Sequence, residues 1–267
     1  MSRRLMAVWF PRLGAERWLR LGACPPGSAL VTVSGTAPDR RIDSLTAAAE
    51  AAGLMAGQRL RHALDLCPHL VALPADAGAE ARLMGALTRA ARWLGLRIVH
   101  PPHRPGMGWR ILVVELRGGS ALPEPEEAAM ARAMTEAARL RLSARPGIAD
   151  TPTAACALAR HGRIGPGGNG RIAPPGRTRV ALAPLPVAAL SLGPAATRRL
   201  GRLGVHSIGE ISDLPPVALR HYLGHEIACR IEGAFGDGPL GGEAPAAGAE
   251  IVPLPSAAFP ADSRWRA

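Results

Sequence analysis

The sequence predicts an α/β protein that ends in a small all-α region. Short apolar strands alternate with helices up to about residue 160, which is typical of a sheet covered by helices. A segment rich in Gly, Pro and Arg follows, and beyond it only helical patterns separated by glycine-containing turns recur. We therefore expect an α/β region over 1–160, a linker over 161–184, a helical region over 185–235 and a disordered tail over 236–267.

Apolar runs and helix-start signals define the elements of the α/β region. Strands are expected at 5–10, 29–33, 70–73, 111–116 and 144–149. Helices are expected at 14–21, 45–52, 58–66, 79–94, 126–141 and 153–160. Ser44 is the expected N-cap of the second helix, and Thr151 followed by Pro152 provides the cap and the first-turn proline of the last one.

The charge of the chain indicates a polyanionic partner. The formal net charge is +11, and all 32 basic residues are arginine, whose planar donors suit phosphate. Ten arginines stand against three acids between Arg160 and Arg230, a net +7. A GC-rich genome would also favour Arg over Lys, but it does not account for the net excess.

Several classes of site and location are not expected. No apolar run reaches the roughly 20 residues of a membrane helix, and residues 1–20 lack the apolar centre of a signal peptide, so we expect a soluble cytoplasmic protein without a membrane partner. The four cysteines are scattered and show no zinc or disulfide spacing. The glycines of 165–170 lack the Lys of a phosphate-binding loop, and His221 with His225 is a poor zinc pair beside Gly224. No metal or other cofactor is expected.

The most specific short feature is a helical hairpin between Ser191 and Glu210. Ser207 with Glu210 three residues later is a capping box, which predicts the start of the second helix. Such a hairpin can offer backbone N–H groups and a helix N-terminus to one DNA phosphate, although an ordinary helical hairpin with a glycine turn has the same pattern. The residues expected to contact DNA are Gly193, Arg198, Arg199, Arg202, Gly204, His206 and Ser207.

The order of these parts resembles the Y-family translesion DNA polymerases over about residues 4–235. The segment 52–58 with 63–70 is similar to that family's fingers, and 147–160 followed by 185–187 and the hairpin is similar to the end of its palm and its thumb. The resemblance implies an α+β palm with a mixed sheet, helical fingers at about 34–80 and a helix-hairpin-helix thumb at 185–235.

The opening segment Trp9-Phe10-Pro11-Arg12-Leu13 resembles the ImuB (UmuC-domain) branch, which is regarded as catalytically inactive. The family's metal-binding carboxylates align with Trp9, Pro11, Arg110 and Ile111, none of which can replace a carboxylate on magnesium. Its triphosphate-holding Tyr and Arg align with Ala47 and Glu50, and its ribonucleotide-excluding residue with Gly14. Glu115 aligns with a non-catalytic acid and is expected to be structural. The resemblance therefore implies no catalytic residues and no enzymatic activity.

The expected function is that of a non-catalytic, DNA-binding accessory factor in damage-induced translesion synthesis, part of the SOS response and DNA repair. The resemblance implies an error-prone replicative-type polymerase subunit and a RecA-like accessory protein as partners. No clamp-binding peptide is visible in 236–267, which argues against a sliding clamp and suggests a C-terminally truncated chain. Two alternatives are an active polymerase that uses displaced acids, and a remnant with only a protein-interaction role.

Overall fold

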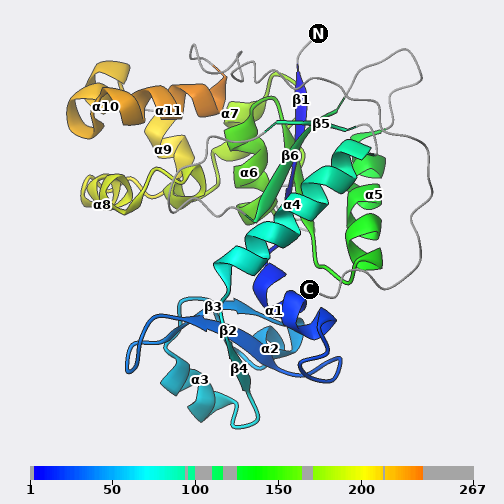
Figure 1. Cartoon of the computed structure of the whole chain (residues 1–267). Helices are drawn as coiled ribbons and strands as arrows, with labels where there is room; N and C mark the ends of the chain where they lie inside the picture. Colours follow the sequence, from blue (N-terminus) through cyan, green and yellow to red (C-terminus); the bar gives the residue numbers. More distant parts are fainter. Residues whose placement is uncertain are drawn as a thin grey trace. The chain divides into compact units, whose positions relative to one another are not determined.

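The computed structural model describes residues 3–93, 96–99, 110–116, 125–163, 171–212 and 214–236, and the chain forms two compact units (Figure 1). The first unit takes its described residues from 3–10, 88–139 and 144–236, and the second from 11–87 and 140–143. Each unit contains one sheet with helices, so the predicted α/β class is confirmed. Within the described ranges, no helix is both long and apolar enough to cross a membrane.

The first unit is built on a four-stranded antiparallel sheet in the order β5-β6-β1-β7. Its strands are β1 (Arg4–Trp9), β5 (Arg97–Ile98), β6 (Ile111–Leu116) and β7 (Arg145–Ala149). The two central strands, β1 and β6, are almost wholly buried, as their continuous apolar runs predict. Their register places Trp9 opposite Ile111 and Leu5 opposite Glu115.

Two helices flank this sheet: α5 (Glu126–Arg139) and α6 (Pro152–His161), on opposite sides of the strands (Figure 1). The side chain of Thr151 accepts from Ala154 N at 3.2 Å, so the predicted cap of α6 is confirmed. Alanines line the buried face of α6, which lets the helix approach the sheet closely. Gly147 on β7 faces α6 at the closest point, where no side chain would fit.

The remainder of the first unit is helical, as expected for 185–235. Its elements are α7 (Thr178–Leu182), a 3₁₀ helix η1 (Val187–Leu190), α8 (Pro194–Arg202), α9 (Ile208–Ser212), α10 (Pro216–Leu223) and α11 (His225–Phe235). The expected linker over 161–184 contains structure as well: Ile172 forms a bridge with Ile148 of β7, α7 follows, and Ala173 and Leu182 are fully buried. Gly and Arg content alone gave no sign of these contacts. Residues 164–170 of that linker and the tail beyond residue 236 lie outside the described residues.

The second unit has a three-stranded sheet in the order β3-β2-β4. Its elements are α1 (Leu13–Arg20), β2 (Leu30–Ser34), β3 (Arg41–Leu45), α2 (Ala47–Ala51), α3 (Leu60–Leu66), β4 (Val71–Pro74) and most of α4 (Ala77–Trp93). The prediction that Ser44 caps a helix over 45–52 is wrong. Ser44 lies in β3 opposite Thr32, and the hydroxyl of Thr46 accepts from Ala49 N and caps the shorter α2.

Arg4 joins the separate parts of the first unit. Its guanidinium donates to both carboxylate oxygens of Glu126 at 2.6 and 2.7 Å, to Asp150 Oδ1 at 2.8 Å and to the carbonyl of Ala173 at 2.7 Å. Burial alone would lower the pKa of Arg4, but the hydrogen bonds to Glu126 and Asp150 outweigh it and raise the pKa. One side chain on β1 thus fixes α5, the end of β7 and the segment that leads to α7.

Candidate nucleic-acid interface

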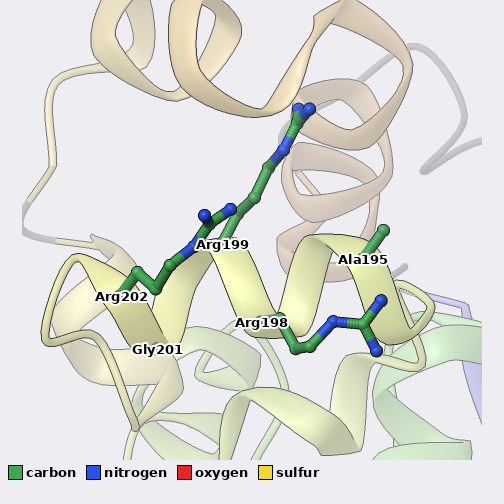
Figure 2. Close-up of a pocket in the computed structure, with 5 residues that line it drawn as sticks. All are labelled: Ala195, Arg198, Arg199, Gly201 and Arg202. Carbon is green, nitrogen blue, oxygen red and sulfur yellow. The ribbon is translucent and has the colours of Figure 1, made fainter.

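Two arginines of α8 are exposed to solvent. Ala196 and Leu200 are the buried residues of this helix, whereas Arg198 and Arg202, four residues apart, lie on its exposed surface. Neither arginine has an ion-pair or hydrogen-bond partner in the part of the chain that the structure describes. Figure 2 shows Arg198 running toward the end of the helix that carries Ala195, beside an open hollow that Arg202 also borders. α8 itself carries no acid, so this surface is positively charged.

Arg199, the third arginine of α8, points away from Arg198 (Figure 2). Its Nη1 lies 3.5 Å from the carbonyl of Tyr222 on α10 and donates a weak hydrogen bond to it. Of the three arginines expected to contact DNA, Arg199 therefore also holds α8 against α10.

The start of α8 is anchored by arginines from two other helices. Ser191 has a left-handed backbone (φ 51°), and its hydroxyl accepts from Arg160 Nη1 of α6 at 3.2 Å. Its carbonyl accepts from Arg230 Nη2 of α11 at 2.8 Å. Gly193 then caps α8 with φ 96°, a conformation that favours glycine. Arg160 and Arg230 thus position the start of α8. These two arginines belong to the positive excess of 160–230, and they have a structural role.

The turn between α8 and α9 is closed by its own hydrogen bonds. Glu210 Oε2 accepts from His206 N at 2.7 Å and from Ser207 N at 3.3 Å, and Ser207 Oγ accepts from Glu210 N at 3.3 Å. The predicted capping box is therefore confirmed. Gly204 turns the chain before it with φ 77°.

This geometry bears on how the hairpin turn could contact DNA. The hairpin was expected to offer backbone N–H groups to one DNA phosphate, and at His206 and Ser207 the carboxylate of Glu210 accepts from both N–H groups. A carboxylate at this place also repels a second anion. Because the side chain of His206 remains exposed, a contact from the turn would have to come from its imidazole.

Other arginines of the helical part have partners inside the protein. Arg220 pairs with Glu232 at 3.1 Å, and Arg179 lies over the ring of Phe235 with its guanidinium carbon 4.3 Å from the ring centroid. These side chains connect α10 and α7 to α11. The positive excess predicted for 160–230 is thus divided among internal contacts, the exposed face of α8 and exposed arginines elsewhere, such as Arg177.

The four positions expected to be vacant metal sites lie at and just beyond the paired ends of two central strands. Trp9 ends β1 opposite Ile111 on β6, and the carbonyl of Arg110 accepts at 2.9 Å from the N–H that follows Trp9. Pro11 follows in the turn before α1. On the other side, the guanidinium carbon of Arg145 lies 5.5 Å from the ring centroid of Trp9. The indole of Trp9, the pyrrolidine ring of Pro11, the guanidinium of Arg110 and the sec-butyl side chain of Ile111 supply no oxygen ligand, so these side chains do not fit magnesium.

In the second unit, the positions aligned with a triphosphate site contain an internal ion pair. Glu50, in the last turn of α2, accepts from Arg12, and Ala47 begins that helix. At Gly14 an added Cβ would lie only 2.7 Å from Glu80 Oε1, which is buried against this backbone. Glycine at this position leaves room for the Glu80 carboxylate, and a larger residue would displace it.

Glu115, the acid of β6, is held by cations on both neighbouring sides. Its carboxylate lies 3.3 Å from Arg3 Nε and 2.8 Å from Arg97 Nη1. These ion pairs agree with the structural role expected of Glu115. Over the described ranges, no group of three or more His, Cys, Asp or Glu side chains could hold a metal ion.

Sequence reasoning did not single out Arg145. The available signal was an arginine at the first position of an apolar strand, directly before Pro146. Its contact with Trp9 depends on the pairing of β7 with β1, which joins residues more than a hundred positions apart.

Comparison with solved structures identifies the fold. No family model matches the chain, and no curated protein sequence matches it. The crystal structure of DinB from Sulfolobus solfataricus has a TM-score of 0.63 with 16% identity and covers 87% of this chain. A post-insertion binary complex of Dbh DNA polymerase has a TM-score of 0.62 with 16% identity over 88%, and a Y-family DNA polymerase chimera has 0.62 with 16% over 87%.

The matched region is part of each of those proteins. The chain spans 66% of the DinB chain and 67% of each of the other two. Identities this low carry information about the fold alone. The two sheets, the helices around them and the helical part after β7 thus give this chain the fold of the Y-family DNA polymerases.

Proposed function

We propose that this chain is a non-catalytic DNA-binding protein that uses a polymerase-like fold as a scaffold. It contacts the DNA backbone through α8, without reading sequence, and acts as an accessory factor in damage-induced translesion synthesis. The observation that carries the proposal is the exposed couple Arg198 and Arg202, on a helix without acids and with no ion-pair or hydrogen-bond partner among the described residues. Two guanidinium groups one helical turn apart suit successive phosphates of a DNA strand.

The loss of catalysis is supported by what occupies the aligned positions. Polymerases of this fold need two magnesium ions held by oxygen ligands, and the end of β1 offers Trp9 beside Arg145 instead. The positive charge of this guanidinium would repel a magnesium ion. The Arg12–Glu50 ion pair likewise uses the side chain aligned with the triphosphate-binding arginine.

The protein partners proposed for this function follow from the resemblance to the ImuB branch. They are an error-prone replicative-type polymerase subunit and a RecA-like accessory protein. In this arrangement the partner polymerase supplies the chemistry, while the present chain holds the primer-template through its arginines.

Fluorescence anisotropy with a labelled duplex, measured over a series of salt concentrations, tests the DNA contact. The variant Arg198→Ala with Arg202→Ala removes two phosphate contacts. Counterion release then predicts that the slope of log K against log salt becomes less steep by about 1.8. The wild-type affinity should fall steeply with salt, and a flat response in the wild type would refute an electrostatic DNA contact.

The matched control is Arg132→Ala with Arg139→Ala. These are also two exposed arginines on one helix of the same unit, so the change in net charge is identical. The control is expected to keep most of the wild-type affinity and slope. Equal losses in both double variants would show that net charge, and not α8, determines binding.

Primer extension with magnesium and all four nucleotides tests the absence of catalysis. No extension by the purified chain is expected. Template-directed extension that Glu115→Gln abolishes would instead show an active polymerase that uses a displaced acid.

A further inference from the structure

One corner of the first unit brings three basic side chains together from three segments. Arg145 begins β7, His161 ends α6, and Arg171 directly precedes the residue that pairs with Ile148 of β7. Arg145 Nη2 donates at 3.0 Å to the carbonyl of Gly162, just past the end of α6. The carbonyl of Arg171 accepts from Ile148 N at 2.8 Å. One side-chain and one backbone hydrogen bond therefore hold the three segments together, and none of them belongs to α8.

This corner concentrates positive charge in a partly buried place. Burial, followed by the charges of Arg160 and Arg145, lowers the pKa of His161. Burial and then the charge of Arg145 lower the pKa of Arg171. Among the described residues, no carboxylate contributes to either shift. Nε of Arg171 is also buried and has no hydrogen-bond partner in the described part of the chain. An anion entering this corner would relieve both the repulsion and the unsatisfied donor.

We propose that Arg145, His161 and Arg171 bind a phosphate group. Two guanidinium groups supply two fixed positive charges and planar donors that match phosphate oxygens. The imidazole supplies a further donor and becomes charged more readily once an anion is present. A phosphate dianion balances the two fixed charges, whereas a single carboxylate balances one. The ring of Trp9, which lies against Arg145, limits the directions in which that guanidinium can turn.

The phosphate group comes either from the DNA backbone or from a free phosphate compound. Both sources present anionic phosphate oxygens to the corner, but a backbone phosphodiester carries one negative charge and a free phosphate up to two, so an experiment has to separate them. The proposed site is independent of α8, because none of its three residues lies on that helix, and a measurement with inorganic phosphate tests it without DNA.

An NMR titration of the His161 imidazole in the full chain tests the site, with His161→Gln to assign the signal. Inorganic phosphate is added at constant ionic strength, maintained with sodium chloride, so that screening alone does not cause a shift. The pKa of His161 is expected to rise by about one unit, because the anion offsets the neighbouring cations. Linkage then requires phosphate to bind about tenfold more tightly to the protonated form.

Arg171→Gln removes one guanidinium from the corner and should weaken phosphate binding about tenfold or more. Arg177→Gln removes the same charge from an exposed position six residues later and should leave the binding of inorganic phosphate unchanged. Thermal melts of both variants show whether the fold is retained. His161→Gln keeps a neutral donor but cannot become charged. Its affinity for phosphate should therefore lack the pH dependence that the protonation of His161 gives the wild type.

The outcomes distinguish the two sources. A saturable shift with inorganic phosphate that Arg171→Gln weakens supports a free phosphate ligand, and a shift seen only with a short duplex supports the DNA backbone. The variant Arg198→Ala with Arg202→Ala should bind inorganic phosphate as the wild type does, which separates this site from the α8 contact. The proposal is overturned if neither ligand moves the His161 signal, or if Arg171→Gln and Arg177→Gln titrate alike with inorganic phosphate.

Discussion

Gly147 is the point at which β7 lies closest to α6, so its replacement by alanine tests the packing that positions Arg145 and the end of α6. A Cβ at residue 147 would lie 2.4 Å from Ala159 N and 2.8 Å from Ala155 O, whereas ordinary contacts begin at 3.4 Å. The strand and helix would have to separate by about 1 Å (3.4 − 2.4). Because both obstacles are backbone atoms, no side-chain rotation relieves the overlap. We expect Gly147→Ala to lower the free energy of unfolding by about 3 kcal/mol, at the upper end for overpacking.

Urea unfolding and thermal melts followed by circular dichroism measure this effect. A loss of about 3 kcal/mol corresponds to a melting temperature lower by roughly 6–12 °C for a chain of this size. Gly201→Ala is the control, because its Cβ would meet nothing within 4 Å and the residue lies inside α8. It should raise stability by up to about 1 kcal/mol, through better helix propensity. A Gly147→Ala variant that melts within about 2 °C of the wild type would refute this packing of β7 on α6.

Three further predictions concern single side chains. Thr151→Ala should lower the free energy of unfolding by about 1–2 kcal/mol, because this hydroxyl caps α6 and donates to α11, and Thr151→Ser should retain most of it in urea denaturation. Burial raises the pKa of Cys156 to about 12, so a thiol reagent at about pH 8 should leave it unmodified in the folded chain but not in urea, as read by peptide mass spectrometry. Hydrogen bonds from the N–H groups of His206 and Ser207 lower the pKa of Glu210, so its stabilisation is present above the ordinary Glu pKa and is lost as the pH falls through the lowered value. Glu210→Gln should therefore melt below the wild type at neutral pH, and the difference should close in acid; equal melting at pH 7 would contradict this.

Local sequence signals correctly predicted the elements whose bounds are set by residues close by in the sequence. The strand β6 has the predicted bounds Ile111–Leu116, and Thr151 caps α6 as expected. The prediction failed at Ser44, where the pairing of β3 with β2 decides the structure. That pairing joins Ser44 to Thr32, twelve residues earlier, and a local pattern of polar residue followed by alanines does not reveal it.

The candidate site shows the same division. Ser207 and Glu210 predicted the start of α9 correctly, because a capping box is local. The capping box did not reveal that the same carboxylate also accepts from the N–H of His206, because that contact depends on the path of the turn before the helix. The contact of Arg145 with Trp9 could not be predicted either, because it exists only once β1 and β7 pair.

The partners of the arginines also determine how strongly the chain should respond to salt when it binds DNA. If each unit of the +7 excess over 160–230 neutralised one phosphate, the salt slope would be about −6. Many of these arginines have partners inside the protein: Arg160, Arg179, Arg199, Arg220 and Arg230. In the described part of the chain, Arg177, Arg198 and Arg202 are exposed without such a partner, which predicts a slope of about −2.7. A DNA strand that also reaches Arg145 and Arg171 would bring the slope to about −4.5. A measured slope near −6 would contradict the division, because arginines that hold Ser191 and Glu232 would then have to release them to bind phosphate.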